Sequence, residues 1–520
     1  MPGSKRAGGK VLFIVIDQLR ADCVTGALAG TARLPHLRAL MGESATFASH
    51  FTVTNPCGPA RASLLTGLYA MNHRSVRNGA PLARHHTNLA LEARRAGREP
   101  LLFGYTDTSA DPEGRHPDDP DLHTYEGLMP GFTEALRLRL ESGNHAWFAH
   151  LEARGYRLPA NRGELYRAID PEGRGRLDAP TLYRAEDSDT AFLTDETLKA
   201  LAVRTREDWL AHVCFIRPHP PLAAPAPYNR MHAPESLPPA AGPASAGAVR
   251  AVHPFFDAFF AEPREKSLHV GFDGRLDRMR ESDRRTLRAL YLGLAAEVDH
   301  HIGRLIGFLR DSGQLDDSLV IVTADHGEML GDHCMWGKAG VHDPAWQVPL
   351  IVRDPRRRAS AGTVIDAFTE SIDLAPSILD WLGLEPPLAF NGRSLLPLLD
   401  GAPPADWRDH VFMELDLGDP VAPTVFQRRL GLGLAEANLA ILRERRFKYV
   451  HFNGGLPPLL FDLEADPLET RDLAPDPAFA PELLRLARAM LDHRMRHAHH
   501  AHSPMKLTPD GVRTAPRGPR

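Results

Sequence analysis

One short segment combines a cysteine, two prolines and an arginine in a pattern that favours anion chemistry. It reads Asn55-Pro56-Cys57-Gly58-Pro59-Ala60-Arg61, and its prolines are typical of a loop that leads into a helix. Cys57 is then expected near the helix N-terminus, where unpaired N–H groups and the helix dipole favour anions. Arg61, one helical turn further along, adds the positive charge and hydrogen-bond donors of its guanidinium group. We interpret the segment as an anion site around a reactive atom; a small cysteine packed under a helix is the other interpretation.

Polar side chains also follow two runs that are typical of buried parallel strands. Residues 11–16 form a continuous apolar run that ends at Asp17 and Gln18, and residues 319–323 form another that leads to Asp325 and His326. Because parallel strands end at the same edge of a sheet, these side chains can converge with Cys57. Two carboxylates, an amide oxygen and an imidazole form a plausible set of ligands for a divalent metal. Asp17 could instead cap a turn.

The elements that must position these residues alternate between strands and helices. We expect further strands at residues 100–105, 209–216 and 348–352, and a long amphipathic helix over residues 283–309. Residues 110–205 are interpreted as irregular, with a short helical piece at residues 133–140. The alternation predicts an α/β fold with a mixed, mainly parallel sheet between layers of helices.

The composition changes after Gly401. Short strand candidates at 411–415, 438–442, 447–452 and 459–463 predict a small antiparallel sheet, and residues 481–496 predict a closing helix. The tail carries His497, His499, His500 and His502, which we interpret as a solvated arm or an oligomer contact rather than a metal site. The expected organisation is a flexible N-terminus at 1–10, a catalytic domain at 11–405, a C-terminal α+β subdomain at 406–490 and an arm at 491–520.

Composition excludes several classes of protein. The 520 residues are 43% hydrophobic and 24% charged, with a net charge of −5. This charge balance lacks the excess of basic residues that is typical of nucleic-acid-binding proteins. The four cysteines form no CxxC pair and predict neither a disulfide framework nor a zinc site of the cysteine type. The early apolar run is too short for a signal peptide, and no run has the length of a membrane span. We expect a cytoplasmic protein with no nucleic-acid or membrane partner.

The chain resembles the sulfatase branch of the alkaline phosphatase superfamily, and within it most closely the bacterial phosphonate monoester hydrolases. The resemblance extends over about residues 11–490. It rests on CGPAR at 57–61 followed by SLLTG at 63–67, on TADHGE at 323–328 and on WGK at 336–338. The resemblance implies an alkaline-phosphatase-like fold.

The resemblance further implies that Cys57 is a precursor. A maturase would oxidise it to formylglycine, an aldehyde that hydrates to a diol. One hydroxyl would attack phosphorus or sulfur, and the other would lose its proton and expel the bound oxyanion. One divalent metal would be held by Asp17, Gln18, Cys57, Asp325 and His326. Gln18 and His326 stand where many sulfatases have an acid and an amide, which favours Mn²⁺, with Fe²⁺, Zn²⁺ or Ca²⁺ as alternatives.

The remaining site residues also follow from the resemblance. Arg61 would hold the diol and the developing charge, while His219 and Lys338 would stabilise transferred oxygens or protonate the leaving group. Asn78 and Tyr105 match substrate-contacting positions. The alternatives are a surface ion pair for Arg61, a turn residue for His219 and a solvated loop residue for Lys338.

The predicted function is hydrolysis of phosphonate monoesters, and also of phosphodiesters. The alternative within the same chemistry is a sulfatase acting on aryl or alkyl sulfates, because these esters carry the same single charge. A non-catalytic binding protein is the alternative of another class, should Cys57 stay unmodified. The expected partners are a small anionic ester, the maturase and further copies of the chain; a homotetramer that exchanges its C-terminal arms is what the resemblance implies.

Overall fold

The computed structural model describes residues 9–140, 143–170, 172–173, 175–262, 268–498, 503 and 505–514. Residues 1–8 of the predicted flexible N-terminus lie outside these ranges, as do His499, His500 and His502. Among the described residues, no helix has the length and apolar character needed to cross a membrane.

An eight-stranded sheet forms the centre of the molecule, in the order β5-β4-β6-β1-β7-β8-β2-β9. Strand β1 pairs in parallel with β6 on one side and with β7 on the other. Strand β8 is antiparallel to both its neighbours. The bounds are β1 Lys10–Ile16, β2 Ala45–Phe47, β4 Pro100–Gly104, β5 Thr133–Arg137, β6 Leu210–Phe215, β7 Ser318–Ala324, β8 Leu350–Arg353 and β9 Val364–Ile365. The predicted mixed, mainly parallel sheet is confirmed.

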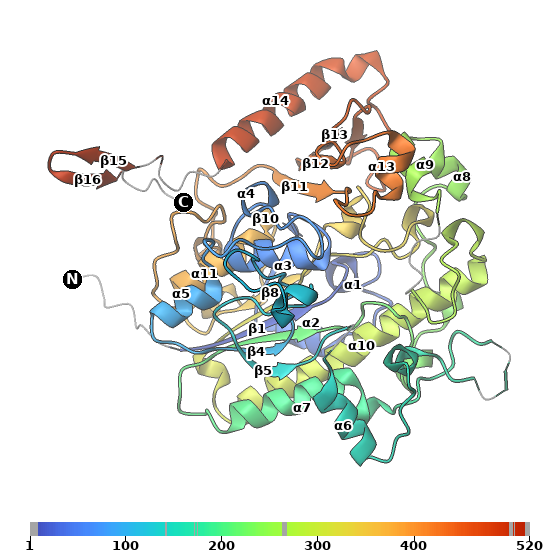
Figure 1. Cartoon of the computed structure of the whole chain (residues 1–520), viewed down its shortest axis with the longest axis vertical. Coiled ribbons are helices and arrows are strands. Elements are labelled where there is room, and N and C mark those ends of the chain that lie inside the picture. Colours follow the sequence, from blue (N-terminus) through green and yellow to red (C-terminus); the bar gives the residue numbers. More distant parts are fainter. Residues whose placement is uncertain are drawn as a thin grey trace.

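Helices cover both faces of this sheet (Figure 1). The 31-residue helix α10 (Glu281–Asp311) packs with α7 (Asp189–Ala202) and α2 (Pro35–Gly42) on one face. The other face carries α3 (Cys57–Thr66), α5 (Leu89–Arg95) and α11 (Leu374–Trp381). The shorter helices are α1 Asp22–Thr25, α4 Ala70–His73, α6 His145–Ala153, α8 Ala246–Arg250, α9 Pro254–Phe259 and α12 Leu396–Leu399. Every residue of β1 and β7 is buried, as a parallel sheet between two helical layers requires.

A four-stranded antiparallel sheet follows in the C-terminal part, as predicted. One of its faces joins the main core through Met413 and Ile441, and the other forms a second core with Phe412, Leu442 and Leu486. Its elements are β11 Val411–Asp416, α13 Val425–Leu430, β12 Asn438–Arg443, β13 Phe447–Phe452, β14 Leu459–Asp462 and α14 Ala480–His497. Since this sheet shares a core with the first part of the chain, the domain boundary at 405 stays a prediction.

Two further sheets have only two strands each. Strand β3 (His50–Phe51) pairs in parallel with β10 (Thr369–Glu370) just before the Cys57 loop. Strands β15 (Met505–Thr508) and β16 (Gly511–Thr514) form a hairpin that lies away from the body of the molecule in Figure 1.

The interpretation of residues 110–205 was wrong in two respects. Residues 133–137 form the edge strand β5, not a helix, because they pair in parallel with β4 and tertiary pairing overrides the helix preference of Glu134, Ala135 and Leu136. Short helical pieces were expected in this region, and α6 is one, but the fourteen-residue α7 is a longer element than predicted. Ser188, whose side chain accepts from the Ala191 N–H, is the N-cap signal that marks the start of α7.

Candidate active site and metal centre

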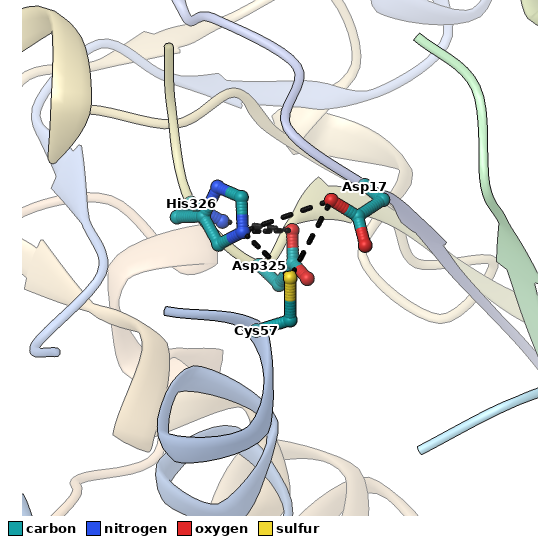
Figure 2. A group of neighbouring side chains, drawn as sticks. All are labelled: Asp17, Cys57, Asp325 and His326. Carbon is teal, nitrogen blue, oxygen red and sulfur yellow. Dashed lines mark hydrogen bonds and ion pairs between the residues drawn. The ribbon is translucent and has the colours of Figure 1, made fainter. Parts of the chain in front are cut away.

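Four potential metal ligands meet at the C-terminal edge of the central strands. Asp17 follows β1, Asp325 and His326 follow β7, and Cys57 is the first residue of α3. One ligand atom from each lies within 4.8 Å of all the others, and all four residues are buried. Figure 2 shows the side chains pointing toward one another from these separate elements. The predicted convergence of the two strand ends with Cys57 is therefore present in the structure.

Hydrogen bonds fix the orientation of the ligands on β7. The Nδ1 atom of His326 lies 3.0 Å from the Gly327 carbonyl oxygen, which leaves Nε2 directed to the cluster, 3.2 Å from Cys57 Sγ. The Asp325 Oδ1 atom accepts the backbone N–H groups of Gln18 and His326, at 3.1 and 2.9 Å. These bonds hold the carboxylate and the imidazole toward one point.

Gln18 joins the cluster through its side-chain amide. It has a left-handed backbone (φ 68°), and its Oε1 atom accepts from Lys338 Nζ at 3.2 Å. Its Nε2 atom donates to Glu328, which also accepts the N–H groups of Leu330 and Gly337 at 2.8 and 2.6 Å. Glu328 thus orients both Gln18 and the loop that carries Lys338. Glu328 belongs to the TADHGE motif, but nothing in the local sequence indicates this orienting role.

Arg61 bridges the two carboxylates from the first turn of α3. Its Nε atom donates to Asp325 Oδ2 at 3.0 Å, and an Nη atom donates to Asp17 Oδ2 at 3.2 Å. The guanidinium lies 4.0 Å from the centre of the Tyr105 ring, and the Tyr105 hydroxyl donates to Asp17. Because Arg61 is only 1% exposed, it is not a surface ion pair. Its charge offsets the repulsion between two buried carboxylates.

Lys338 and His219 lie together on the other side of Cys57. The Lys338 Nζ atom is 3.0 Å from Cys57 Sγ and 3.2 Å from His219 Nε2. The His219 Nδ1 atom lies 2.7 Å from the Pro220 carbonyl oxygen, so Nδ1 carries the proton and Nε2 accepts from the ammonium. Burial and the charge of Lys338 lower the pKa of His219 well below its ordinary value. Burial lowers the pKa of Lys338, but Cys57 and Asp17 raise it more, so the pair keeps its proton on Lys338.

Asn78 lies beside the helix start rather than among the potential ligands. Its Oδ1 atom accepts the Gly58 N–H at 3.0 Å. A Cβ atom at Gly58 would lie 3.0 Å from both this oxygen and the Asp107 carbonyl oxygen, so a larger residue would need these neighbours to shift. All the residues predicted for the site therefore lie in or next to one cluster.

Asp107 is a neighbour of the site that the sequence reasoning did not single out. It is 8% exposed, has a left-handed backbone (φ 46°) and belongs to the loop after β4. Burial raises its pKa to about 8 despite the opposing charge of Arg61. The polar run of residues 105–108 after the end of β4 indicated this position, but nothing in that run distinguishes Asp107 from its neighbours.

Comparison with known proteins fits this arrangement. The sulfatase family model matches residues 10–384, which include every residue of the cluster. The chain belongs to the sulfatase family. A second model, for the C-terminal part of N-sulphoglucosamine sulphohydrolase, matches residues 331–496 of this sulfatase-family chain.

Individual relatives of this sulfatase-family chain match it over nearly its whole length. A multifunctional alkaline phosphatase superfamily protein from Trinickia caryophylli is 38% identical over 97% of this chain and 98% of its own. The solved phosphonate monoester hydrolase of Silicibacter pomeroyi is 50% identical with a TM-score of 0.94, covering 98% of this chain and 100% of its own. That of Agrobacterium radiobacter is 40% identical with a TM-score of 0.93, over the same shares. A choline-sulfatase from Rhizobium meliloti is 28% identical over 90% of this chain and 82% of its own.

Proposed function

We propose that this protein hydrolyses phosphonate monoesters, and also phosphodiesters, through a formylglycine made from Cys57. The observation that carries the proposal is the position of the Cys57 side chain, whose sulfur lies 3.0 Å from Lys338 and 3.2 Å from His326, and beside Asp17. A reactive group there faces both the metal ligands and a cation. The 50% identity with a phosphonate monoester hydrolase supports phosphonate esters as the preferred class.

The side chains fit one divalent metal ion. Asp17, Asp325 and His326 offer two oxygens and one nitrogen within 4.8 Å of each other, and Gln18 offers an amide oxygen nearby. The His326 Nε2 atom is available because Nδ1 is engaged by Gly327. This mixed oxygen and nitrogen set favours Mn²⁺, Fe²⁺ or Zn²⁺ over Ca²⁺. A bound divalent ion supplies positive charge that polarises oxygen and lowers the pKa of a hydroxyl group.

An unmodified thiol suits this site poorly. Burial and the neighbouring Asp17 raise the pKa of the Cys57 thiol well above its usual value, while Lys338 lowers it. A thiol would also form an adduct without the second hydroxyl needed to expel the product. An aldehyde hydrate at position 57 has that hydroxyl, so oxidation by a maturase is part of the proposal.

The cationic side chains have distinct roles in this proposal. Arg61 holds the two carboxylates in place and balances their charge, and Lys338 donates a hydrogen bond or a proton to an ester oxygen. His219 acts as a positioning residue, because its Nε2 atom accepts from Lys338 and directs the ammonium to residue 57. We therefore propose Lys338, rather than His219, as the donor to the leaving group.

A sulfatase acting on aryl or alkyl sulfates is the second candidate, favoured by the match to the sulfatase family model. A binding protein with unmodified Cys57 is the third. The mass of the proteolytic peptide that contains Cys57, from protein made with a maturase, distinguishes an enzyme from a binding protein. An unmodified thiol in this peptide would contradict the proposed enzyme. Initial rates on phenyl phosphonate and aryl sulfate esters then rank the two hydrolases, and faster sulfate turnover would reverse our order.

We further propose that the protein is cytoplasmic and forms a homo-oligomer. The hairpin of β15 and β16 supports an exchanged arm, because it carries exposed apolar side chains at Leu507 (81%) and Val512 (61%). Sedimentation of the whole chain and of a chain ending at residue 498 tests this: a tetramer that survives the truncation rules out the arm as its cause.

A further inference from the structure

A cavity of about 510 Å³ opens beside Cys57. Asn55, Pro56, Asn78 and Lys338 line one side of it. Lys338 also contacts Cys57 Sγ at 3.0 Å, and Asn78 binds the Gly58 N–H. Lys338, whose Nζ atom lies 3.0 Å from Cys57 Sγ, therefore belongs both to the lining of the cavity and to the candidate active site.

The C-terminal part of the chain supplies the opposite wall. Leu415 and Leu417 come from the end of β11 and the residue that follows it, and Val425 and Phe426 open helix α13. All four side chains are at most 8% exposed. The Phe426 ring stacks on Phe255, with centroids 5.1 Å apart. This wall presents a packed apolar surface to the cavity.

Hydrogen bonds make the wall rigid. The Thr424 hydroxyl accepts the Gln427 N–H and donates to the Leu417 carbonyl oxygen. The Gln427 amide oxygen accepts the N–H groups of Thr424 and Asp419, at 2.9 and 2.8 Å, which completes a capping box. The start of α13 and the turn before it are thus held as one unit.

The wall is also fixed relative to Cys57. The Arg77 Nε atom donates to the Gly418 carbonyl oxygen at 2.9 Å, next to Asn78 in the chain. The Glu414 N–H donates to the Val53 carbonyl oxygen at 2.9 Å, four residues before Cys57. Both contacts join the C-terminal sheet to the loops of the catalytic site, so the shape of the cavity is set by two parts of the chain.

Two of the acidic residues that line the cavity, Glu262 and Asp419, interact with neighbouring groups. Glu262 pairs with Arg428 at 2.7 Å, and an Asp419 carboxylate oxygen accepts the N–H groups of Val421 and Ala422. Arg77, whose Nε atom donates to the Gly418 carbonyl oxygen, and Asp416 also line the cavity. The apolar wall thus lies beside several charged side chains, among them Lys338.

We propose that this cavity binds the leaving group of the ester, and that Leu417, Val425 and Phe426 select apolar alcohols of aromatic size. The inference rests on the proposed function, because the leaving oxygen must lie at Lys338 for its substituent to enter the cavity. A volume of about 510 Å³ lies within the usual range of roughly 300–1,000 Å³ for small-molecule sites and accommodates more than one aromatic ring. Specificity would then reside in the C-terminal part, while the chemistry resides in the central sheet.

The test compares two methylphosphonate esters with leaving groups of similar acidity and different size, 4-nitrophenyl and 4-nitro-1-naphthyl. Val425→Phe places a ring in the cavity. We expect it to lower kcat/KM for the naphthyl ester roughly tenfold or more relative to the nitrophenyl ester, since steric changes of this size in apolar pockets give about 10–200-fold discrimination. Val421→Phe is the matched control, because Val421 is 90% exposed and does not line the cavity. The ratio of its kcat/KM values for the two esters should equal that of the wild type.

A second variant works in the opposite direction. Leu417→Ala enlarges the cavity, so we expect it to raise kcat/KM for the naphthyl ester relative to the nitrophenyl ester. This variant provides the test if Val425→Phe fails to fold. Active variants whose ratios stay at the wild-type value would overturn the leaving-group assignment alone. Wild-type protein with oxidised residue 57 that hydrolyses neither ester would instead overturn the proposed function.

Discussion

Two lysines in two different clusters, the half-buried Lys338 and the buried Lys448, illustrate how similar charges serve different tasks. Lys338 contacts a sulfur, an amide oxygen and a neutral imidazole, and it lines a cavity. Lys448 lies on β13, is fully buried and contacts the carboxylates of Asp343 and Glu469, at 2.8 and 2.6 Å. Lys338 is surrounded by weak or neutral acceptors, whereas Lys448 is neutralised by two anions.

The difference indicates which cluster is available for binding and which holds the fold. The Lys448 cluster connects the C-terminal sheet to the loop at Asp343, and Arg443 of β12 adds a further ion pair to Asp343 at 3.2 Å. Such a fully paired cluster specifies how two parts of the chain dock. The Lys338 cluster keeps a donor directed at Cys57 and at a cavity, as a site that receives an anion requires.

Removing Cys57 should give the largest effect. We expect Cys57→Ala to reduce turnover by roughly 10⁴-fold or more, because the covalent route is lost, while the protein stays folded. Esterase rates with circular dichroism as a folding control check this. Substantial turnover by a folded Cys57→Ala protein would mean that residue 57 is not the nucleophile precursor.

Removing Lys448 should affect stability and not chemistry. Lys448→Met leaves the buried Glu469 carboxylate without its cation and removes one of the two cations beside Asp343, which we expect to lower the free energy of unfolding by about 3–5 kcal/mol. Urea midpoints and kcat per folded molecule are measured together. Lys199→Met is the matched control, since Lys199 is exposed and pairs only with Glu196, and its midpoint should hardly change. An unchanged midpoint for Lys448→Met would remove the contrast between the clusters.

Removing Lys338 should show the reverse pattern. We expect Lys338→Met to lower kcat/KM by roughly 10²–10³-fold, the usual effect of losing a donor to the developing charge, with little change in the urea midpoint. A large loss of stability with retained kcat/KM would place Lys338 with Lys448 as a structural cation.

The smallest effect concerns pH and His342, which stacks on His333 beside the Lys448 cluster at a ring distance of 3.7 Å. Burial, His333 and Lys448 lower the pKa of His342 well below its ordinary value. Below about pH 6.5 the unfolded chain therefore binds a proton that the folded chain does not, and stability falls by about 1.4 kcal/mol per pH unit for one such proton. His342→Phe should reduce this slope between pH 6.5 and 5.5.

His116→Phe provides the control for the pH experiment. The His116 side chain is 77% exposed, so its loss should leave the slope of the urea midpoint against pH as in the wild type. A slope that is the same in His342→Phe and wild type would show that His342 is protonated in the folded protein, contrary to the expected direction.

Local patterns in the sequence were sufficient for much of the fold and the site. The apolar runs before Asp17 and Asp325 correctly predicted β1 and β7, because a strand buried on both faces has apolar side chains at consecutive positions. The prolines around Cys57 correctly predicted a helix start at that residue. Parallel pairing then placed the polar strand ends at one edge, as topology requires.

Other features were decided only by tertiary structure. Residues 133–137 became a strand because the edge of β4 offered backbone partners that outweigh local helix preference. Glu328 and Lys448 gained their roles from contacts with residues such as Gln18 and Asp343, which lie 310 and 105 positions away in the chain. Local sequence determines which segments are apolar and where strands and helices end. The partners of a buried charge depend on which distant segments pack around it, because burial makes an unpaired charge unfavourable whatever its neighbours in sequence.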